Sequence, residues 1–163
     1  MKLSKTLTEA INNQIAMELH SSYLYLGMSA YCESQNFPGA AKWLRAQSHE
    51  ETGHAMKLFD YLYTRDAKAE LMTLAAPPAA WKSLRAVFDA TLKHEQTVTA
   101  SIQKLHDLAV KEKDTAAQIL LQWYITEQVE EEKNVTDILA KFDMIGDSPM
   151  GLMFLDKQLG ERG

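Results

Sequence analysis

The sequence predicts an all-α protein: a four-helix bundle with a long crossover between its second and third helices and a short fifth helix at the C-terminal end. Three observations support this fold class. Apolar side chains recur at three- and four-residue steps along four long segments, the pattern of a buried helix face. The 163 residues include only 7 glycines and 4 prolines, so few positions interrupt a helix. Hydrophobic residues make up 46% of the chain, which argues against disorder.

The first helix is expected over about residues 4–33 and the second over about residues 38–65. Between them, the segment 36–39 (Asn-Phe-Pro-Gly) breaks the pattern, and Pro38 suits the first turn of a helix. The expected inward positions of the first helix are Leu7, Ile11, Ile15, Glu18, Ser22 and Tyr25. Those of the second helix are Trp43, Leu44, Gln47, Glu51, His54, Leu58 and Tyr61.

A connection of about fifteen residues without helical pattern separates the second and third helices, between Asp66 and Ala80. The pair Pro77-Pro78 prevents a helix from continuing through it. Such a length is unusual in a compact domain. It is explained if the connection crosses the whole bundle, so that the second and third helices run parallel.

The third helix is expected over about residues 81–110, and the fourth over about 114–143 with Asp114 as its N-cap. A short amphipathic helix follows at about 149–159; it is too short to be stable without a partner surface. The whole chain, 1–163, is expected to form a single domain. The expected inward positions of the third helix are Leu84, Phe88, Glu95, Val98, Ile102 and Leu105. Those of the fourth are Leu120, Tyr124, Glu127, Glu131, Ile138 and Phe142.

Composition excludes several classes of function. A net charge of −5 argues against a nucleic-acid partner, which requires a basic surface, and suits a protein that attracts cations. The single cysteine, Cys32, excludes an internal disulfide and a cysteine-based zinc site. The N-terminus has no secretory signal pattern, and no apolar stretch is long enough to span a membrane. A cytoplasmic location without membrane association is therefore expected.

The most informative pattern is a set of acids in the apolar stripes. Glu18, Glu51, Glu95 and Glu131 each interrupt the stripe of a different helix, and His54 follows Glu51 at i+3, on the same helix face. A single such acid usually lies on a solvated or salt-bridged face. Four aligned acids indicate a metal site in the bundle core, because a buried carboxylate is costly unless it is paired or bound to metal. Many carboxylates with few imidazoles suit iron or manganese, and point toward a dinuclear iron site.

Other motifs join these acids in a family resemblance. They are Glu18 with Tyr25, the run 49–54 (His-Glu-Glu-Thr-Gly-His), His94-Glu95-Gln96, Trp123-Tyr124, the run 127–131 (Glu-Gln-Val-Glu-Glu), the run 59–62 and the C-terminal run 151–157. With these motifs the chain resembles the bacterial non-haem ferritins, members of the ferritin-like di-iron family, over almost its full length. Ferritin-like bundles are the known example of a carboxylate-rich di-iron site between helices.

The resemblance implies roles for the five central residues. Glu18, Glu51 and His54 are expected to hold a first iron. Glu51 is expected to bridge to a second iron, which Glu95 and Glu131 complete.

Five further residues take roles by resemblance alone. Gln128 stands where these ferritins have a weak iron ligand or a residue next to the ligands. Glu50, Glu127 and Glu130, together with the glutamate at 131, match a third iron site. Tyr25 is expected to stabilise the centre or to act in electron transfer; a buried tyrosine with a hydrogen-bonded hydroxyl is an equally good interpretation.

The implied function is iron storage and detoxification. Fe(II) would be oxidised at the di-iron ferroxidase centre by dioxygen or hydrogen peroxide and kept as ferric mineral. The implied assembly is a hollow 24-subunit shell, with the tail helix at its four-fold contacts.

Two departures from related families narrow the expectation. Bacterioferritins and rubrerythrins have a second Glu-x-x-His on the fourth helix. This chain does not, because Glu127 is followed at i+3 by Glu130. Bacterioferritins have a haem-binding methionine directly after the bridging glutamate, where this chain has Thr52, so no haem is expected. Two alternatives stay open: a di-iron oxidase or peroxidase that stores no mineral, and a purely structural helical bundle.

Overall fold

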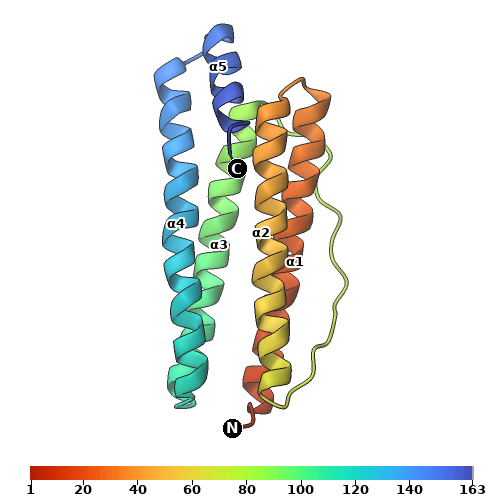
Figure 1. Cartoon of the computed structure of the whole chain (residues 1–163), viewed down its shortest axis with the longest axis vertical. Helices are drawn as coiled ribbons and strands as arrows, with labels where there is room; N and C mark the ends of the chain where they lie inside the picture. Colours follow the sequence, from red (N-terminus) through yellow and green to blue (C-terminus); the bar gives the residue numbers. More distant parts are fainter. Residues whose placement is uncertain (163) are drawn as a thin grey trace.

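The computed structural model describes residues 1–162. Within this range the chain forms five α-helices and no strand: α1 (Lys5–Ser34), α2 (Pro38–Thr64), α3 (Leu84–Lys111), α4 (Thr115–Ile145) and α5 (Pro149–Leu159). The four long helices stand side by side as a bundle, and α5 lies at one end of it (Figure 1). The predicted fold class is therefore confirmed. None of the described helices combines the length and the hydropathy needed to cross a membrane.

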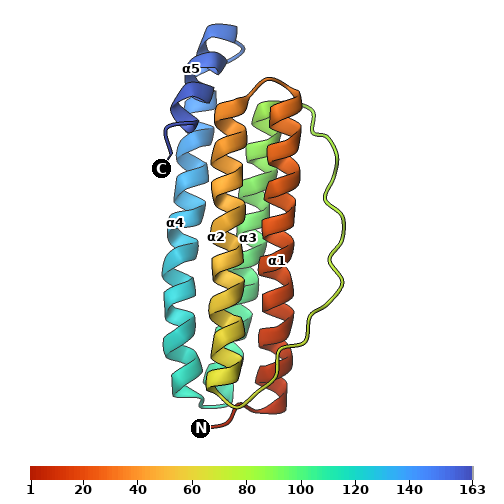
Figure 2. The same cartoon turned by 45° about the vertical axis from the view of Figure 1, so that its right-hand side comes forward.

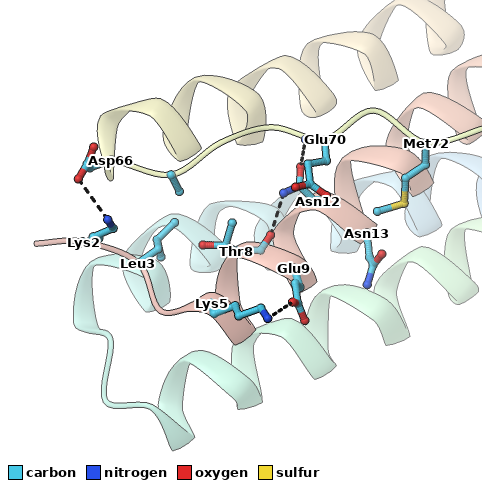
Figure 3. Close-up of a pocket in the computed structure, with 11 residues that line it drawn as sticks. Lys2, Leu3, Lys5, Thr8, Glu9, Asn12, Asn13, Asp66, Glu70 and Met72 are labelled. Carbon is cyan, nitrogen blue, oxygen red and sulfur yellow. Dashed lines mark hydrogen bonds and ion pairs between the residues drawn. The ribbon is translucent and has the colours of Figure 1, made fainter.

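The connection between α2 and α3 runs the length of the bundle beside α1, which makes α2 and α3 parallel as predicted (Figure 2). Two contacts hold it there. Pro77 packs so closely against Gly27 that a Cβ atom at Gly27 would lie 2.7 Å from the proline Cγ. Nearer the start of α1, Asn12 donates to the Lys68 carbonyl at 3.0 Å and accepts from the Glu70 backbone N–H at 2.7 Å. Figure 3 shows Asn12 beside a cavity of about 560 Å³ between the start of α1 and this connection.

Capping residues set the helix ends. α3 begins at Leu84, three residues later than predicted, because Ser83 accepts the Ala86 N–H at 3.1 Å as N-cap. Trp81 stays outside the helix and packs on the ring of Tyr31. Asp114 is the N-cap of α4, as predicted, and accepts the Ala117 N–H at 2.9 Å.

The predicted inward face was wrong by one position at four places. In α4 the buried residues are Leu121 and Gln128. The residues expected there, Leu120 and Glu127, are only half-buried. In the same way Ser21 and Leu62 are buried in place of Ser22 and Tyr61. With 3.6 residues per turn, a buried row alternates steps of three and four, and the order of those steps depends on the neighbouring helices. The list of buried positions in α4 is Ala117, Leu121, Tyr124, Gln128, Glu131, Val135, Ile138 and Phe142.

The hydrophobic core is divided into two clusters, one toward each end of the bundle. The cluster nearer α5 contains Tyr25, Leu44 and Phe88, and the other contains Ile15 and Leu58. In every long helix a stretch without buried apolar residues separates the two clusters. Each stretch contains one of the four predicted glutamates. The stretches lie between the cluster members at 15 and 24, 44 and 55, 88 and 98, and 124 and 135. The core therefore has a polar layer across its middle.

The tail helix α5 docks on the beginning of α2. The N-cap residue of α2 is Phe37, whose side chain makes no capping hydrogen bond. Instead, the Asp156 carboxylate accepts the N–H groups of Gly39, at 3.2 Å, and Ala40, at 2.8 Å. A Cβ atom at Gly39 would lie 1.7 Å from the Asp156 carbonyl oxygen, so this close approach requires glycine. The short helix thus finds its partner surface on its own bundle.

Candidate metal centre

The polar layer contains the four predicted glutamates and the predicted histidine, one acid from each long helix. Glu18, Glu51 and Glu95 are each 1% exposed, Glu131 5% and His54 7%. Ligand atoms of Glu18, Glu51 and His54 lie within 4.8 Å of one another, and so do those of Glu51, Glu95 and Glu131. Glu51 belongs to both groups. The fold therefore brings together all five residues predicted for the central site.

Hydrogen bonds from neighbouring side chains hold the carboxylates of Glu18, Glu51 and Glu131. Gln14 donates to Glu18 Oε1 at 2.8 Å, while Glu18 Oε2 is buried without a hydrogen-bond partner. His54 Nδ1 lies 3.1 Å from Glu51 Oε2. Gln47 donates from Nε2 to Glu51 Oε1 at 3.2 Å and to Glu131 Oε2 at 2.6 Å. An unpartnered buried carboxylate oxygen is unfavourable, and a cation beside it would remove that cost.

The Glu95 carboxylate is held from two directions. Tyr25 donates its hydroxyl to Glu95 Oε1. Gln128 donates from Nε2 to Glu95 Oε2 at 3.1 Å and to Thr99 Oγ1 at 3.2 Å. Both residues belong to the predicted set, and both contact a carboxylate of the central layer.

Burial raises the pKa of every carboxyl group in the layer. The pKa of Glu18 rises to about 8, first through burial and then through the charge of Glu51. That of Glu131 rises to about 7, through burial and Glu95. Burial also raises the pKa of Glu95, and raises that of Glu51 well above its ordinary value together with the charges of Glu95 and Glu131.

No lysine or arginine in residues 1–162 forms an ion pair with these four acids. A bound cation would therefore supply the missing positive charge and displace protons. The donor set, four carboxylates and one imidazole, is that of a hard, oxygen-binding metal ion such as iron.

The residues predicted for a third site are only partly brought together. Glu127 and Glu131 group with His54, within 4.8 Å, and Glu127 Oε2 lies 3.9 Å from His54 Nε2. Glu50 is outside this group, and its carboxylate accepts from Arg162 Nη2 at 2.7 Å. Glu130 is exposed and belongs to none of the three groups.

Sequence reasoning missed three residues: Gln14 and Gln47, which donate to carboxylates of the layer, and Arg162, which donates to Gln47. Gln47 lies on the predicted inward face of the second helix, and an amide one turn before Glu51 on that face is a signal of a hydrogen bond to it. Gln14, one turn before Glu18, offered the same signal. Arg162 lies beyond the last helix, and no sequence pattern connects it with residues more than 100 positions away.

Comparison with known proteins supports the family resemblance. A model of the ferritin-like domain family matches residues 8–145. The chain is 41% identical over 158 residues to a probable bacterial non-haem ferritin-like protein of Haemophilus influenzae, with 97% of this chain and 96% of that protein covered. Identity to the bacterial non-haem ferritin of Escherichia coli O6:H1 is also 41%, over 157 residues, with 96% and 95% covered.

A solved structure shares the whole fold. An open-pore ferritin from the hyperthermophilic archaeon Archaeoglobus fulgidus superimposes with a TM-score of 0.97 at 42% identity, covering 99% of this chain and 98% of that one. The resemblance inferred from the sequence is therefore confirmed. The chain belongs to the ferritin family and is an iron-storage protein.

Proposed function

We propose that the chain oxidises Fe(II) to Fe(III) at a di-iron ferroxidase centre inside the bundle and stores the product as ferric mineral. The observation that carries this proposal is the position of Glu51, which belongs to two groups of ligand atoms, each within 4.8 Å. Glu51 can therefore bridge two ions. Glu18, Glu51 and His54 hold the first iron, and Glu95 and Glu131 complete the second site.

Iron is the substrate of this reaction. Carboxylate oxygens are hard, anionic donors, so they favour Fe(III) over Fe(II) and make the loss of an electron easier. Each of two neighbouring Fe(II) ions gives up one electron, and one dioxygen accepts both and becomes hydrogen peroxide with two protons. Hydrogen peroxide can serve as the oxidant for further Fe(II). The carboxyl groups with raised pKa, Glu18 and Glu131 among them, release their protons when iron binds.

The surrounding residues have supporting roles in the proposal. Tyr25 and Gln128 hold Glu95 through the hydrogen bonds described above, and Tyr25 would thereby stabilise the centre. His54, Glu127 and Glu131 support a third iron position next to the centre. Glu50 and Glu130, both exposed, would pass iron between the centre and the interior of the proposed hollow shell. Haem is not part of the proposal, because Thr52 follows Glu51.

The proposed assembly is a hollow shell of 24 copies of the chain. Its support is an apolar surface on α5, where Met150, Met153 and Phe154 are 80%, 72% and 68% exposed. A surface of this kind is typical of a subunit contact. We place the protein in the cytoplasm, and the one cysteine, Cys32, which is free and buried, fits a reducing compartment.

Anomalous diffraction at the iron edge after a brief Fe(II) soak tests the centre directly. Two peaks are expected on either side of Glu51, with a weaker third beside Glu127. Glu51→Gln removes the bridging charge while keeping the size of the side chain, and should abolish the paired peaks. Crystals that show no iron in the polar layer would refute the proposal.

Iron retention separates the proposed function from its alternatives. After oxidation in air and gel filtration, a ferritin keeps many irons per subunit, a di-iron oxidase about two, and a structural bundle none. Glu130→Ala tests the proposed iron transfer separately. Unchanged turnover and an unchanged ratio of iron to oxidant in this variant would contradict a role for Glu130.

A further inference from the structure

The C-terminal segment after α5 returns to α2 and contacts it through one side chain, Arg162. Its Nη1 donates to Gln47 Oε1 at 2.9 Å and to the Trp43 carbonyl at 3.3 Å. Its Nη2 pairs with Glu50 Oε2 at 2.7 Å. The guanidinium also lies over the indole of Trp43, with Cζ 4.5 Å from the ring centroid. Four contacts therefore hold this side chain in one place.

Gln47 connects this guanidinium to the candidate metal centre. The side chain of Gln47 is buried, and its Nε2 donates to Glu51 and Glu131, at 3.2 and 2.6 Å. These are carboxylates of two different helices, α2 and α4. A single amide group thus lies between Arg162 on one side and two proposed iron ligands on the other.

The chemistry of the amide makes this connection directional. A guanidinium has only donors, and a carboxylate that has lost its proton to a bound metal ion has only acceptors. With Oε1 facing Arg162 and Nε2 facing the carboxylates, every contact pairs a donor with an acceptor. In the flipped amide, Nε2 would face the guanidinium and Oε1 would face two carboxylates, so that three favourable contacts would become unfavourable. Arg162 therefore selects the amide orientation that holds Glu51 and Glu131 together.

We propose that Arg162 is a positioning residue of the iron centre: through Gln47 it fixes the distance and orientation of Glu51 and Glu131. The inference rests on the proposed function of these two ligands and adds a residue outside the bundle helices. It also links two parts of the molecule. Arg162 follows α5, and α5 is anchored on α2 through Asp156, so the docked tail and the geometry of the centre are coupled.

Anaerobic titration with Co(II) tests this inference, because Co(II) is not oxidised under these conditions and its visible spectrum reports its ligands. Arg162→Leu should weaken Co(II) binding on the order of tenfold, the usual effect of losing a partner that orients metal ligands, and should alter the spectrum. In the Gln47→Leu background, Arg162→Leu should add no further loss, since the effect passes through Gln47.

Lys42→Leu is the matched control. Lys42 also ties the tail to α2, by donating to the Gly160 carbonyl at 2.9 Å, but it does not contact Gln47. Its replacement should leave Co(II) binding and the spectrum unchanged. Equal weakening by Lys42→Leu and Arg162→Leu would overturn the inference, because tail docking alone would then explain the loss.

The conservative variant Arg162→Lys keeps the positive charge but loses the fork that reaches Gln47 and Glu50 together. We expect it to bind Co(II) more weakly than the unmodified protein. Full binding by this variant, or by Arg162→Leu in an assembled protein of unchanged thermal midpoint, would refute the inference and leave the proposed function intact. Failure of the unmodified protein to bind Co(II) would overturn both.

Discussion

At Glu18, one carboxylate oxygen accepts from Gln14, and the other faces the interior of the bundle without a partner. Glu51, which groups with it, and Glu131 of the same polar layer are also buried acids. When no cation is present, such groups stay protonated in the folded protein and ionise in the unfolded chain. The residues proposed for iron binding therefore reduce the stability of the metal-free protein at neutral pH.

This cost predicts a pH dependence of stability. The pKa of Glu18 is about 8 in the folded protein against 4.5 for a free side chain, and that of Glu131 is about 7. Between about pH 4.5 and about pH 8 the folded state binds more protons than the unfolded state, so the free energy of unfolding falls as pH rises through this range. Thermal midpoints of the metal-free protein across this range measure the slope. Glu18→Gln should flatten it and raise the midpoint at the alkaline end; an unchanged slope would contradict the prediction.

A second prediction concerns Tyr25, whose hydroxyl donates to Glu95 inside the core. Tyr25→Phe removes this bond and should destabilise the protein by about 1–3 kcal/mol, the cost of leaving a buried acceptor without its donor. It should slow Fe(II) oxidation in stopped-flow absorbance while the number of Fe(II) ions bound anaerobically stays the same. Unchanged oxidation with lower stability would favour the simpler interpretation, a buried tyrosine with only a structural role.

Among the helices, α2 depends on a distant residue for its cap. Its own N-cap residue, Phe37, contributes no side-chain bond, and the Asp156 carboxylate of α5 accepts two of its first N–H groups instead. A carboxylate at this position also interacts favourably with the helix dipole. The beginning of α2 and the docking of α5 are therefore one structural unit.

Asp156→Ala tests that unit. The loss of the cap should destabilise the protein by about 0.5–2 kcal/mol. Hydrogen exchange should quicken in α5 and the first turn of α2, and stay unchanged at the far end of the bundle. Asp147→Ala, which removes an exposed acid that makes no side-chain hydrogen bond in the described chain, is the control. Equal effects of both substitutions would mean that net charge, rather than capping, is responsible.

The elements and the central site followed from local patterns in the sequence, and the remaining details did not. Pro38 and Asp114 mark helix starts through their own backbone chemistry, so those ends were predictable. The choice between Glu127 and Gln128 as the buried residue depends on how α4 packs against its neighbours, which spacing alone does not determine. The pairing of Arg162 with Gln47 joins positions 115 apart in the sequence, beyond the reach of any periodicity.

For the molecule as a whole, the exposed apolar side chains of α5 predict how subunits associate. Phe154, 68% exposed, makes this surface more apolar than an isolated subunit needs. Phe154→Glu should reduce the mass of the assembly in analytical ultracentrifugation, because it places a charge in a subunit contact, while the helical circular dichroism stays the same. Phe154→Leu keeps the surface apolar and should assemble normally. A full-sized shell from Phe154→Glu would place the contact elsewhere.

The division of the core into two apolar clusters has a mechanical consequence. Each cluster is an apolar unit of its own, and the polar layer between them contains buried carboxylates in place of apolar contacts. Local opening is therefore expected to be easiest at this layer when no ion is present. Iron bound by carboxylates from all four long helices would cross-link α1, α2, α3 and α4 at one level of the bundle. The iron to be stored would then also stabilise the folded protein that stores it.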